Sequence, residues 1–397
     1  MPLRFAKIGC HDEHDPGRKI MKDIVVIGAG KIGSTVAEML AATGDYRVTL
    51  TDKSQDQLDR LRPPAGVTRF RLDVEDGLRL RSLLKGKYAV LSAAPFHLTT
   101  KVADAARESA AHYLDLTEDV ASTRHVTKLA DGAASAFIPQ CGLAPGFITI
   151  AAYDMARSFD ELHDLKMRVG ALPQYPSNAL NYNLTWSTDG VINEYCEPCE
   201  AIVNGELREV PPLEAREEFA LDGVTYEAFN TSGGLGSLCE TLKGKVDNLN
   251  YKTIRYPGHA AIMKALLQDL RLRERRYILK DILENALPST LQDVVIVFVT
   301  ASGMKQGRLM QETYANKIYS QVRDGSHLSA IQITTAAGIC AALDLLASGH
   351  LPTRGFVRQE DIPLALFLAN RFGRIYARAD SDAPAAQGSR ARLDSVA

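Results

Sequence analysis

The chain has 397 residues, of which 46% are apolar and 24% are charged, and its net charge is −2 at pH 7. At about 150 residues per domain, this length predicts two or three domains, and such a chain can bury a sizeable core. The near-neutral charge argues against nucleic-acid and membrane partners, because proteins that bind them normally carry a basic excess.

The cysteines and the apolar runs indicate where the protein works. Six cysteines without repeating spacing favour free thiols over a disulfide scaffold. No N-terminal apolar segment predicts a signal peptide, and no run reaches the roughly 20 residues of a membrane span. We therefore expect a cytoplasmic protein. Cys196 and Cys199 form a C-x-x-C pair, but no second pair of ligands follows, so no metal site is expected.

Strands and helices alternate through the first part of the chain. The apolar run Asp23–Gly28 predicts a strand buried on both faces, and the spacing over 31–43 predicts an amphipathic helix. This alternation predicts a parallel sheet with right-handed crossovers. Further strands are expected at 46–51, 67–72, 88–92, 112–116 and 136–138, with helices at 55–61, 77–84, 99–109 and 120–130.

The pattern changes after Gly142, where longer β-like stretches and many Gly and Pro residues appear. Successive strands of this kind suggest an antiparallel second domain. The expected strands include 165–169, 183–186, 201–203, 253–254 and 294–300, and the expected helices are 261–267, 276–283 and 329–346.

A glycine motif follows the first strand. Gly28, Gly30 and Gly33 form a G-x-G-x-x-G between a buried strand and an amphipathic helix, which is the setting of a Rossmann dinucleotide-binding turn. The glycines allow a tight turn, an approach to the pyrophosphate and close helix packing. The helix that begins at Lys31 and Ile32 offers free N–H groups to the phosphates.

The cofactor is predicted from the end of the second strand. Asp52 lies 19 residues after the last glycine of the motif. A carboxylate there accepts hydrogen bonds from ribose hydroxyls and repels a 2′-phosphate, which favours NAD. The adjacent Lys53 keeps NADP possible. After the fourth strand, three small residues suit a loop that passes under the cofactor: Ala93, Ala94 and Pro95.

Several motifs together resemble the saccharopine dehydrogenase family: VVIGAGKIG, SAAPF, HYLDLTED, CGLAPGF, YNLTWSTDG and IRYPGH. The resemblance covers residues 21 to about 376. It implies an α/β fold, with a Rossmann-type parallel sheet and a second, mixed α/β substrate and dimerisation domain, and a homodimer. It also implies oxidation of a C–N bond, with hydride transfer to a nicotinamide and hydrolysis of the imine.

These features divide the chain as follows. We expect a Rossmann domain at 21–143, a substrate and dimerisation domain at 144–345, and a segment at 346–378 that packs back on the Rossmann domain. Residues 1–20 are expected to form a flexible extension, and residues 379–397 a disordered tail.

The resemblance also implies site residues near the nicotinamide. Asp115 is predicted to anchor the substrate amine or accept its proton, with Thr117 beside the substrate. Glu118 and Asp119 are interpreted as caps of the next helix. The resemblance places the cysteine and the glycine of the CGLAPGF motif near the cofactor. Two interpretations of Cys141 stay open, a weak acid–base group and an apolar filler. The glycine of this motif, Gly142, is a predicted cofactor residue.

Substrate contacts are expected from the other motifs. Arg255 offers a bidentate fork for a carboxylate, and His259 is a candidate acid or base. Asp189 stands where relatives acting on saccharopine often carry an arginine, which leaves carboxylate binding to other groups. The remaining predicted substrate contacts are Phe96, Trp186 and Ser187.

The leading hypothesis is an NAD-dependent saccharopine dehydrogenase that forms glutamate, 2-aminoadipate 6-semialdehyde and NADH. Lysine 6-dehydrogenase is the close alternative, followed by a carboxyspermidine-forming reductase and a non-catalytic NAD(H)-binding sensor. Saccharopine, with three carboxylates, demands several cations in the cleft, whereas a polyamine demands carboxylates.

Overall fold

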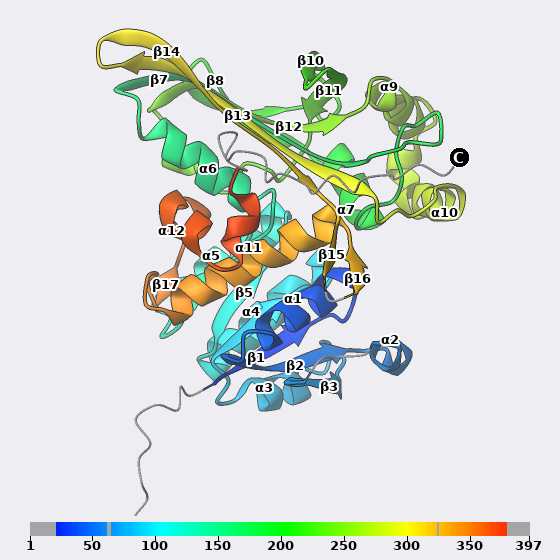
Figure 1. The fold of residues 1–397 in the computed structure, drawn as a ribbon, viewed down its shortest axis with the longest axis vertical. Coiled ribbons are helices and arrows are strands. Elements are labelled where there is room, and N and C mark those ends of the chain that lie inside the picture. Colours follow the sequence, from blue (N-terminus) through cyan, green and yellow to red (C-terminus); the bar gives the residue numbers. More distant parts are fainter. Residues whose placement is uncertain (1–20, 62–64, 324, 379–397) are drawn as a thin grey trace, which may run out of the picture.

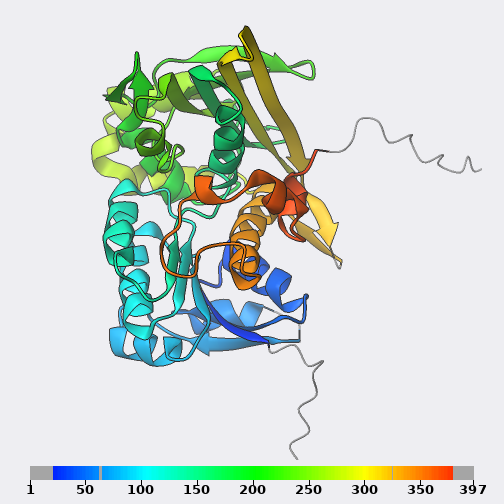
Figure 2. The same ribbon diagram turned by 90° about the vertical axis from the view of Figure 1, so that its left-hand side faces the viewer.

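The structure, a computed structural model, describes residues 21–61, 65–323 and 325–378. The predicted extension at 1–20 and the predicted tail at 379–397 lie outside the described residues. Two sheets are stacked one above the other, with the long helix α11 (Ala330–Ala347) between them (Figure 1). The side view shows the same layers, with the blue-to-cyan part below and the green-to-yellow part above (Figure 2).

The first sheet contains seven parallel strands, which confirms the parallel sheet predicted from the alternation. Their order is β17-β6-β5-β4-β1-β2-β3, so the chain reverses direction across the sheet between β1 and β4. The strands are β1 (Lys22–Ile27), β2 (Tyr46–Asp52), β3 (Val67–Arg71), β4 (Ala89–Ser92), β5 (His112–Asp115), β6 (Ala136–Ile138) and β17 (Gly355–Phe356).

Helices cover both faces of this sheet, which explains why its central strands are apolar on both sides. Helices α1 and α11 lie on one face, and α3, α4 and α5 lie on the other. The predicted limits of α3 and α5 agree with the structure, whereas α4 begins at Phe96 rather than Thr99. The helices are α1 (Lys31–Ala41), α2 (Gln55–Arg60), α3 (Gly77–Leu84), α4 (Phe96–Ser109) and α5 (Val120–Ala130).

The second sheet has eight strands, six of them in the order β10-β11-β12-β7-β13-β14; β8 pairs with β12, and β9 pairs with β8. Its inner face and α6 (Phe147–Ala156) share one apolar core with α1 and α11. The strands are β7 (Glu161–Pro173), β8 (Cys199–Val203), β9 (Glu206–Val210), β10 (Glu217–Leu221), β11 (Val224–Asn230), β12 (Val246–Arg255), β13 (Asp293–Lys305) and β14 (Arg308–Tyr319).

Two expectations for this half were wrong. The sheet is mixed rather than antiparallel, because β12 pairs with β7 in parallel; the long connection between them allows the crossover that parallel strands need. Residues 183–186 form no strand and make one isolated bridge, from Leu184 to Ser289. Here Leu184 and Trp186 pack against a cluster of helices instead of a strand.

The helices of the second half lie at one end of its sheet (Figure 1). They are α7 (Thr188–Cys196), α9 (His259–Lys264), which continues into a π-helical turn at Ala265–Asp269, and α10 (Arg276–Ala286). The described residues also form the short α8 (Leu238–Thr241), α12 (Leu364–Ala369) and a two-stranded ribbon of β15 (Gln321–Arg323) and β16 (Ser326–Leu328).

Helix α11 joins the two layers. The helix is long and apolar enough to cross a membrane, but 89% of it is buried inside the protein. There it packs against α1. Asp293, the first residue of β13, accepts hydrogen bonds from the backbone N–H groups of Ala330 and Ile331 at the start of the helix. The chain therefore returns to the first sheet at α11, ahead of the limit at residue 346 that the sequence suggested.

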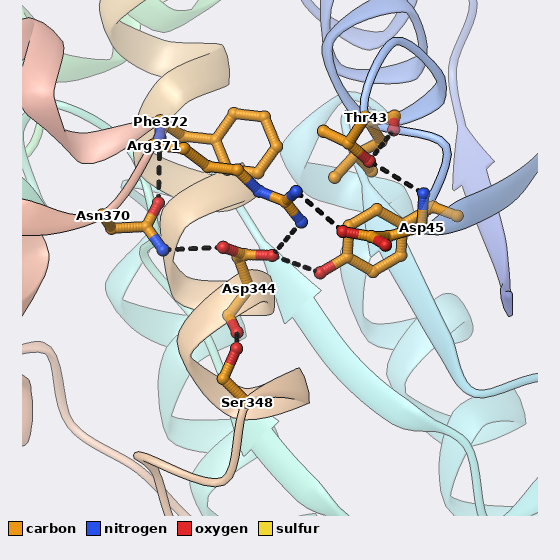
Figure 3. A network of polar contacts seen from close by, with 9 residues as sticks. Thr43, Asp45, Asp344, Ser348, Asn370, Arg371 and Phe372 are labelled. Atoms are coloured by element: carbon orange, nitrogen blue, oxygen red, sulfur yellow. Dashed lines mark hydrogen bonds and ion pairs between the residues drawn. The ribbon is translucent and has the colours of Figure 1, made fainter. Parts of the chain in front are cut away.

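A polar network fastens the C-terminal segment to the first layer (Figure 3). Arg371 donates to Asp45 at 2.7 Å and to Asp344 of α11 at 2.6 Å. Asp344 also accepts hydrogen bonds from Tyr46 and Asn370. Each carboxylate of the network is thus paired within the fold, and the segment after α11 is held on α1 and β2.

Candidate functional site

A cleft of about 850 Å³ lies between the two layers. Its floor is the carboxyl edge of the first sheet, where β1, β4 and β5 end, and its roof is formed by β7, β12 and α7. In open parallel sheets, ligands bind at this edge, next to the point where the strand order reverses. The position of the cleft is therefore the one expected for a dinucleotide.

The turn after β1 fits a dinucleotide phosphate. A Cβ on Gly33 would lie 1.8 Å from the carbonyl oxygen of Gly28, so only glycine allows this helix to approach the strand so closely. Gly30 has open space where a Cβ would be, and it begins α1 with no side-chain cap. The first N–H groups of α1, from Lys31 and Ile32 onward, thus face the cleft unobstructed and can bind an anion.

Asp52 lines the same end of the cleft. Its carboxylate accepts hydrogen bonds from the backbone N–H groups of Ala29 and Ser54, both at 2.9 Å. These bonds hold a charged group at the end of β2, next to the glycine turn. The side chain of Lys53 is exposed and is not among the residues that line the cleft.

Further segments of the chain also line this end of the cleft. The loop after β4 lines the cleft as predicted, with Ala93, Ala94, Pro95 and Phe96, and so does Gly142. The start of α11 also lines it, which sequence reasoning missed because these residues lie some 300 positions away. Gln332 of α11 donates to the carbonyl oxygen of Lys31 at 3.5 Å and so joins the two helix starts.

Asp115 lies beneath the cleft rather than in it. The residue is fully buried, and its carboxylate accepts hydrogen bonds from the Tyr113 hydroxyl and from the N–H groups of Thr117 and Gln140. Burial raises the pKa of this carboxyl to about 6 despite these bonds. The structure therefore gives Asp115 the geometry of an anchor for the turn after β5, and not that of a group in contact with a substrate.

The other two predicted catalytic residues are also absent from the cleft surface. The Cys141 thiol is buried, donates to the carbonyl oxygen of Ile138 at 3.0 Å, and has its pKa raised by burial and by Asp115, which matches the filler interpretation. His259 is 1% exposed, and its Nδ1 lies 2.9 Å from the carbonyl oxygen of Leu180. Burial and the nearby Arg255 lower the pKa of His259 to about 3, so its ring is neutral at ordinary pH.

Arg255 is held in place by this neutral histidine. The Tyr195 hydroxyl lies 3.1 Å from His259 Nε2 and accepts a hydrogen bond from Arg255 Nε at 2.9 Å. Arg255 Nη1 donates to the carbonyl oxygen of Ile254. The guanidinium lines the cleft while only 2% exposed. Within the described part of the chain, no carboxylate forms an ion pair with it.

Two carboxyl groups in the cleft were not predicted as functional. Glu194 of α7 is 7% exposed, and burial raises its pKa to about 8 although Arg255 opposes the shift. Glu118 follows β5, and burial with the nearby Asp119 and Asp115 raises its pKa to about 7. Asp119 is the N-cap of α5, as expected, but Glu118 faces the cleft. Only burial distinguishes these residues, and burial is not visible in one sequence.

The remaining predicted substrate contacts lie along the same cleft: Thr117, Trp186 and Ser187. Asp189 stands where an arginine could have bound a substrate carboxylate. It forms an ion pair with Lys280 at 2.5 Å. Arg276 at the cleft is paired with Glu197 at 2.6 Å. Arg255 is therefore the cleft guanidinium, among the described residues, that is left without a carboxylate partner.

The two cysteines of the C-x-x-C pair are buried, and neither is in a disulfide. Among the residues that the structure describes, no three His, Cys, Asp or Glu side chains are grouped closely enough to hold a metal ion.

The chemistry of the cleft follows from its two ends. One end offers backbone N–H groups and a carboxylate, which suit a dinucleotide. The other offers an unpaired guanidinium and two carboxyl groups whose pKa values lie near neutral pH, which suit a substrate with both carboxylate and amine groups.

Curated proteins that resemble this chain include an alpha-aminoadipic semialdehyde synthase and a saccharopine dehydrogenase. The mitochondrial alpha-aminoadipic semialdehyde synthase of Mus musculus is 23% identical over 267 residues, which covers 62% of this chain and 28% of that protein. The NADP(+), L-glutamate-forming saccharopine dehydrogenase of Saccharomyces cerevisiae is 22% identical over 261 residues, or 62% of this chain and 57% of that protein. The chain thus matches about a quarter of the first protein and just over half of the second.

A solved structure shows the same fold. The apo saccharopine dehydrogenase (L-Glu forming) from Saccharomyces cerevisiae superposes with a TM-score of 0.72 at 16% identity, over 89% of this chain and 96% of that one. Family profiles cover most of the chain as well. The saccharopine dehydrogenase NADP binding domain matches residues 24–138, and the saccharopine dehydrogenase C-terminal domain matches residues 142–370. The chain therefore belongs to the saccharopine dehydrogenase family of oxidoreductases.

Proposed function

We propose that this protein is an NAD-dependent dehydrogenase that oxidises the side-chain amine of lysine. Lysine, NAD and water would give 2-aminoadipate 6-semialdehyde, ammonia and NADH. The observation that carries the proposal is the buried Arg255, which faces the cleft without an ion pair among the described residues. A buried charge without a partner is costly, and a substrate carboxylate would compensate it.

The balance of charge in the cleft favours lysine over saccharopine. Lysine brings one carboxylate and two amines, which matches one unpaired guanidinium and the two carboxyl groups of Glu118 and Glu194. Saccharopine brings three carboxylates. Since Arg276 is already paired with Glu197, two of those carboxylates would meet the acidic side chains rather than a free cation.

NAD is favoured over NADP by Asp52. A 2′-phosphate at the adenosine ribose would approach a carboxylate that accepts hydrogen bonds from two backbone N–H groups. When bound, the nicotinamide accepts a hydride from the carbon that carries the amine. The protein orients the two partners. The start of α1 binds the phosphates, Arg255 fixes the substrate carboxylate, and Trp186 forms a wall that limits water.

Saccharopine oxidation is the second candidate, because a relative of this chain is named for it. In that case Arg276, which lines the cleft, would have to leave Glu197 and bind a second carboxylate.

The test is the formation of reduced cofactor by the purified full chain, with lysine or saccharopine and with NAD or NADP. We expect turnover with lysine and NAD, together with release of ammonia and an aldehyde that closes on its own amine to a cyclic imine. Turnover of saccharopine with release of glutamate, and none with lysine, would reject the proposal in favour of the second candidate. Tight binding of NADH without turnover of any amine would indicate a sensor.

A further inference from the structure

We propose that the two carboxyl groups of the cleft divide the work on the substrate. Glu118 is the base at the reacting nitrogen, and Glu194 holds the α-ammonium group beside the carboxylate that Arg255 binds. The inference rests on the proposed function and assigns roles within its site.

The position of Glu194 suits a head-group contact. It lies on α7 in the roof of the cleft, on the same side as Arg255 at the end of β12. Its backbone carbonyl is fixed by the N–H of Ser232, whereas no group of the described residues donates a hydrogen bond to its carboxyl. A guanidinium and a carboxylate on one wall complement the carboxylate and ammonium of an α-amino acid.

The position of Glu118 suits the reacting end. It follows β5, at the sheet edge where a dinucleotide crosses, and it lines the cleft together with Thr117. Its backbone is fixed on both sides. Asp115 accepts from the N–H of Thr117 at 3.0 Å, and the Thr117 hydroxyl accepts from the N–H of Asp119 at 3.1 Å. The buried Asp115 is therefore a positioning residue for this turn.

The proton balance assigns Glu118 two tasks. First it takes a proton from the substrate ammonium, because only the neutral amine can support loss of a hydride from its carbon. The carbon is then oxidised to the iminium, and Glu118 passes its proton to solvent. Next it takes a proton from the water whose oxygen bonds to that carbon. It returns this proton to nitrogen and removes the proton of the new hydroxyl as the C–N bond breaks, so that ammonia and an aldehyde leave and Glu118 passes the hydroxyl proton to solvent.

The pH dependence follows from the groups around the two carboxyls. Below about 7 Glu118 holds a proton and cannot accept another, so kcat/KM should rise as pH increases through this value. Below about 8 Glu194 is neutral in the free protein, which weakens ammonium binding. The two carboxyls act on each other, since Glu118 raises the pKa of Glu194. The other ionisable groups that face one or both of them are Asp115, Asp119, Arg255, Tyr182, Tyr195, Cys199 and Tyr251.

The experiment compares Glu118→Gln and Glu194→Gln on lysine and on 6-aminohexanoate, which keeps the carboxylate and the reacting amine but lacks the α-amine. We expect Glu118→Gln to lower kcat by about 10²- to 10⁴-fold on both substrates and to remove the rise near neutral pH. Glu194→Gln should raise KM by about tenfold for lysine and leave 6-aminohexanoate unchanged. Glu284→Gln, at an exposed glutamate lining the same cleft, is the matched control.

Melting temperature and NADH affinity of each variant show whether the fold is kept. A Glu118→Gln enzyme that folds and retains wild-type kcat overturns the base assignment. An equal rise in KM for both substrates with Glu194→Gln overturns the ammonium contact. If the wild type oxidises a different amine instead of lysine, the proposed function fails, but the effect of Glu118→Gln on that amine still decides its role.

Discussion

Two arginines mark the difference between the junction of the layers and the cleft. At the junction, Arg371 is paired with Asp45 and Asp344, and Asp344 accepts two further hydrogen bonds (Figure 3). In the cleft, Arg255 is more deeply buried, yet its described partners are a tyrosine hydroxyl and a backbone carbonyl.

The guanidinium of Arg371 completes the fold, whereas that of Arg255 is available to a ligand. Both guanidiniums lie near aromatic rings, Arg371 at 5.8 Å from the ring centre of Tyr46 and Arg255 at 5.2 Å from that of Tyr182. Among the described residues, the junction arginine is in ion pairs with carboxylates, whereas Arg255 is in none and has only the longer-range influence of Glu194. Burial without a counter-charge opposes stability, so Arg255 is explained by binding rather than by folding.

Among the effects that test this comparison of the two arginines, the largest is expected at Arg255. Arg255→Met should lower kcat/KM for lysine by about a hundredfold, since losing the partner of a buried carboxylate costs about 3 kcal/mol. The measurement is steady-state kinetics with lysine and with 1,5-diaminopentane, which has no carboxylate. The loss should be confined to lysine, and the melting temperature should not fall. An equal loss with both amines would show that Arg255 does not bind the carboxylate.

The opposite pattern is expected at the junction. Arg371→Met leaves the buried Asp344 without its cation, and breaking such a pair is destabilising. Because Arg371 is 37% exposed, the cost is reduced to about 2 kcal/mol, or a fall in melting temperature of about 2–4 °C. Calorimetry measures the fall, and unchanged kcat and KM values serve as the control. Reduced turnover without loss of stability would contradict the division between the two regions.

The sequence predicted the parts of the molecule that depend on local pattern. The glycine turn, Asp52 and six of the seven strands of the first sheet each lie within one short segment, where spacing and side-chain type are informative. The two-residue strand β17 was not predicted. The substrate end was predicted in part, through Arg255 and Trp186. Asp115, Cys141 and His259 were polar residues in the right segments, but their side chains are buried and bonded within the protein.

The residues missed by the sequence share a physical cause. Glu118 resembles a helix cap and Glu194 an ordinary helical glutamate until the second layer covers them, and this cover is what raises their pKa values. The same holds for Gln332, which reaches the cofactor end of the cleft only because α11 packs against α1. Long-range packing creates these features, and one sequence does not reveal it.

The smallest expected effect concerns a carboxylate at the cofactor end of the cleft, Asp52. Its two backbone donors make it resemble the paired Asp344, but its place at the ribose end exposes its charge to the cofactor. Asp52→Asn keeps an acceptor oxygen and removes the charge, so the ratio of kcat/KM for NAD to that for NADP should fall by about tenfold, equivalent to about 1.4 kcal/mol. Lys53 and Arg71 lie exposed beside it and favour the added phosphate. Kinetics with both cofactors at fixed lysine measure the ratio. An unchanged ratio would mean that Asp52 serves the fold, as Asp344 does, and that cofactor choice is set by other residues of the cleft.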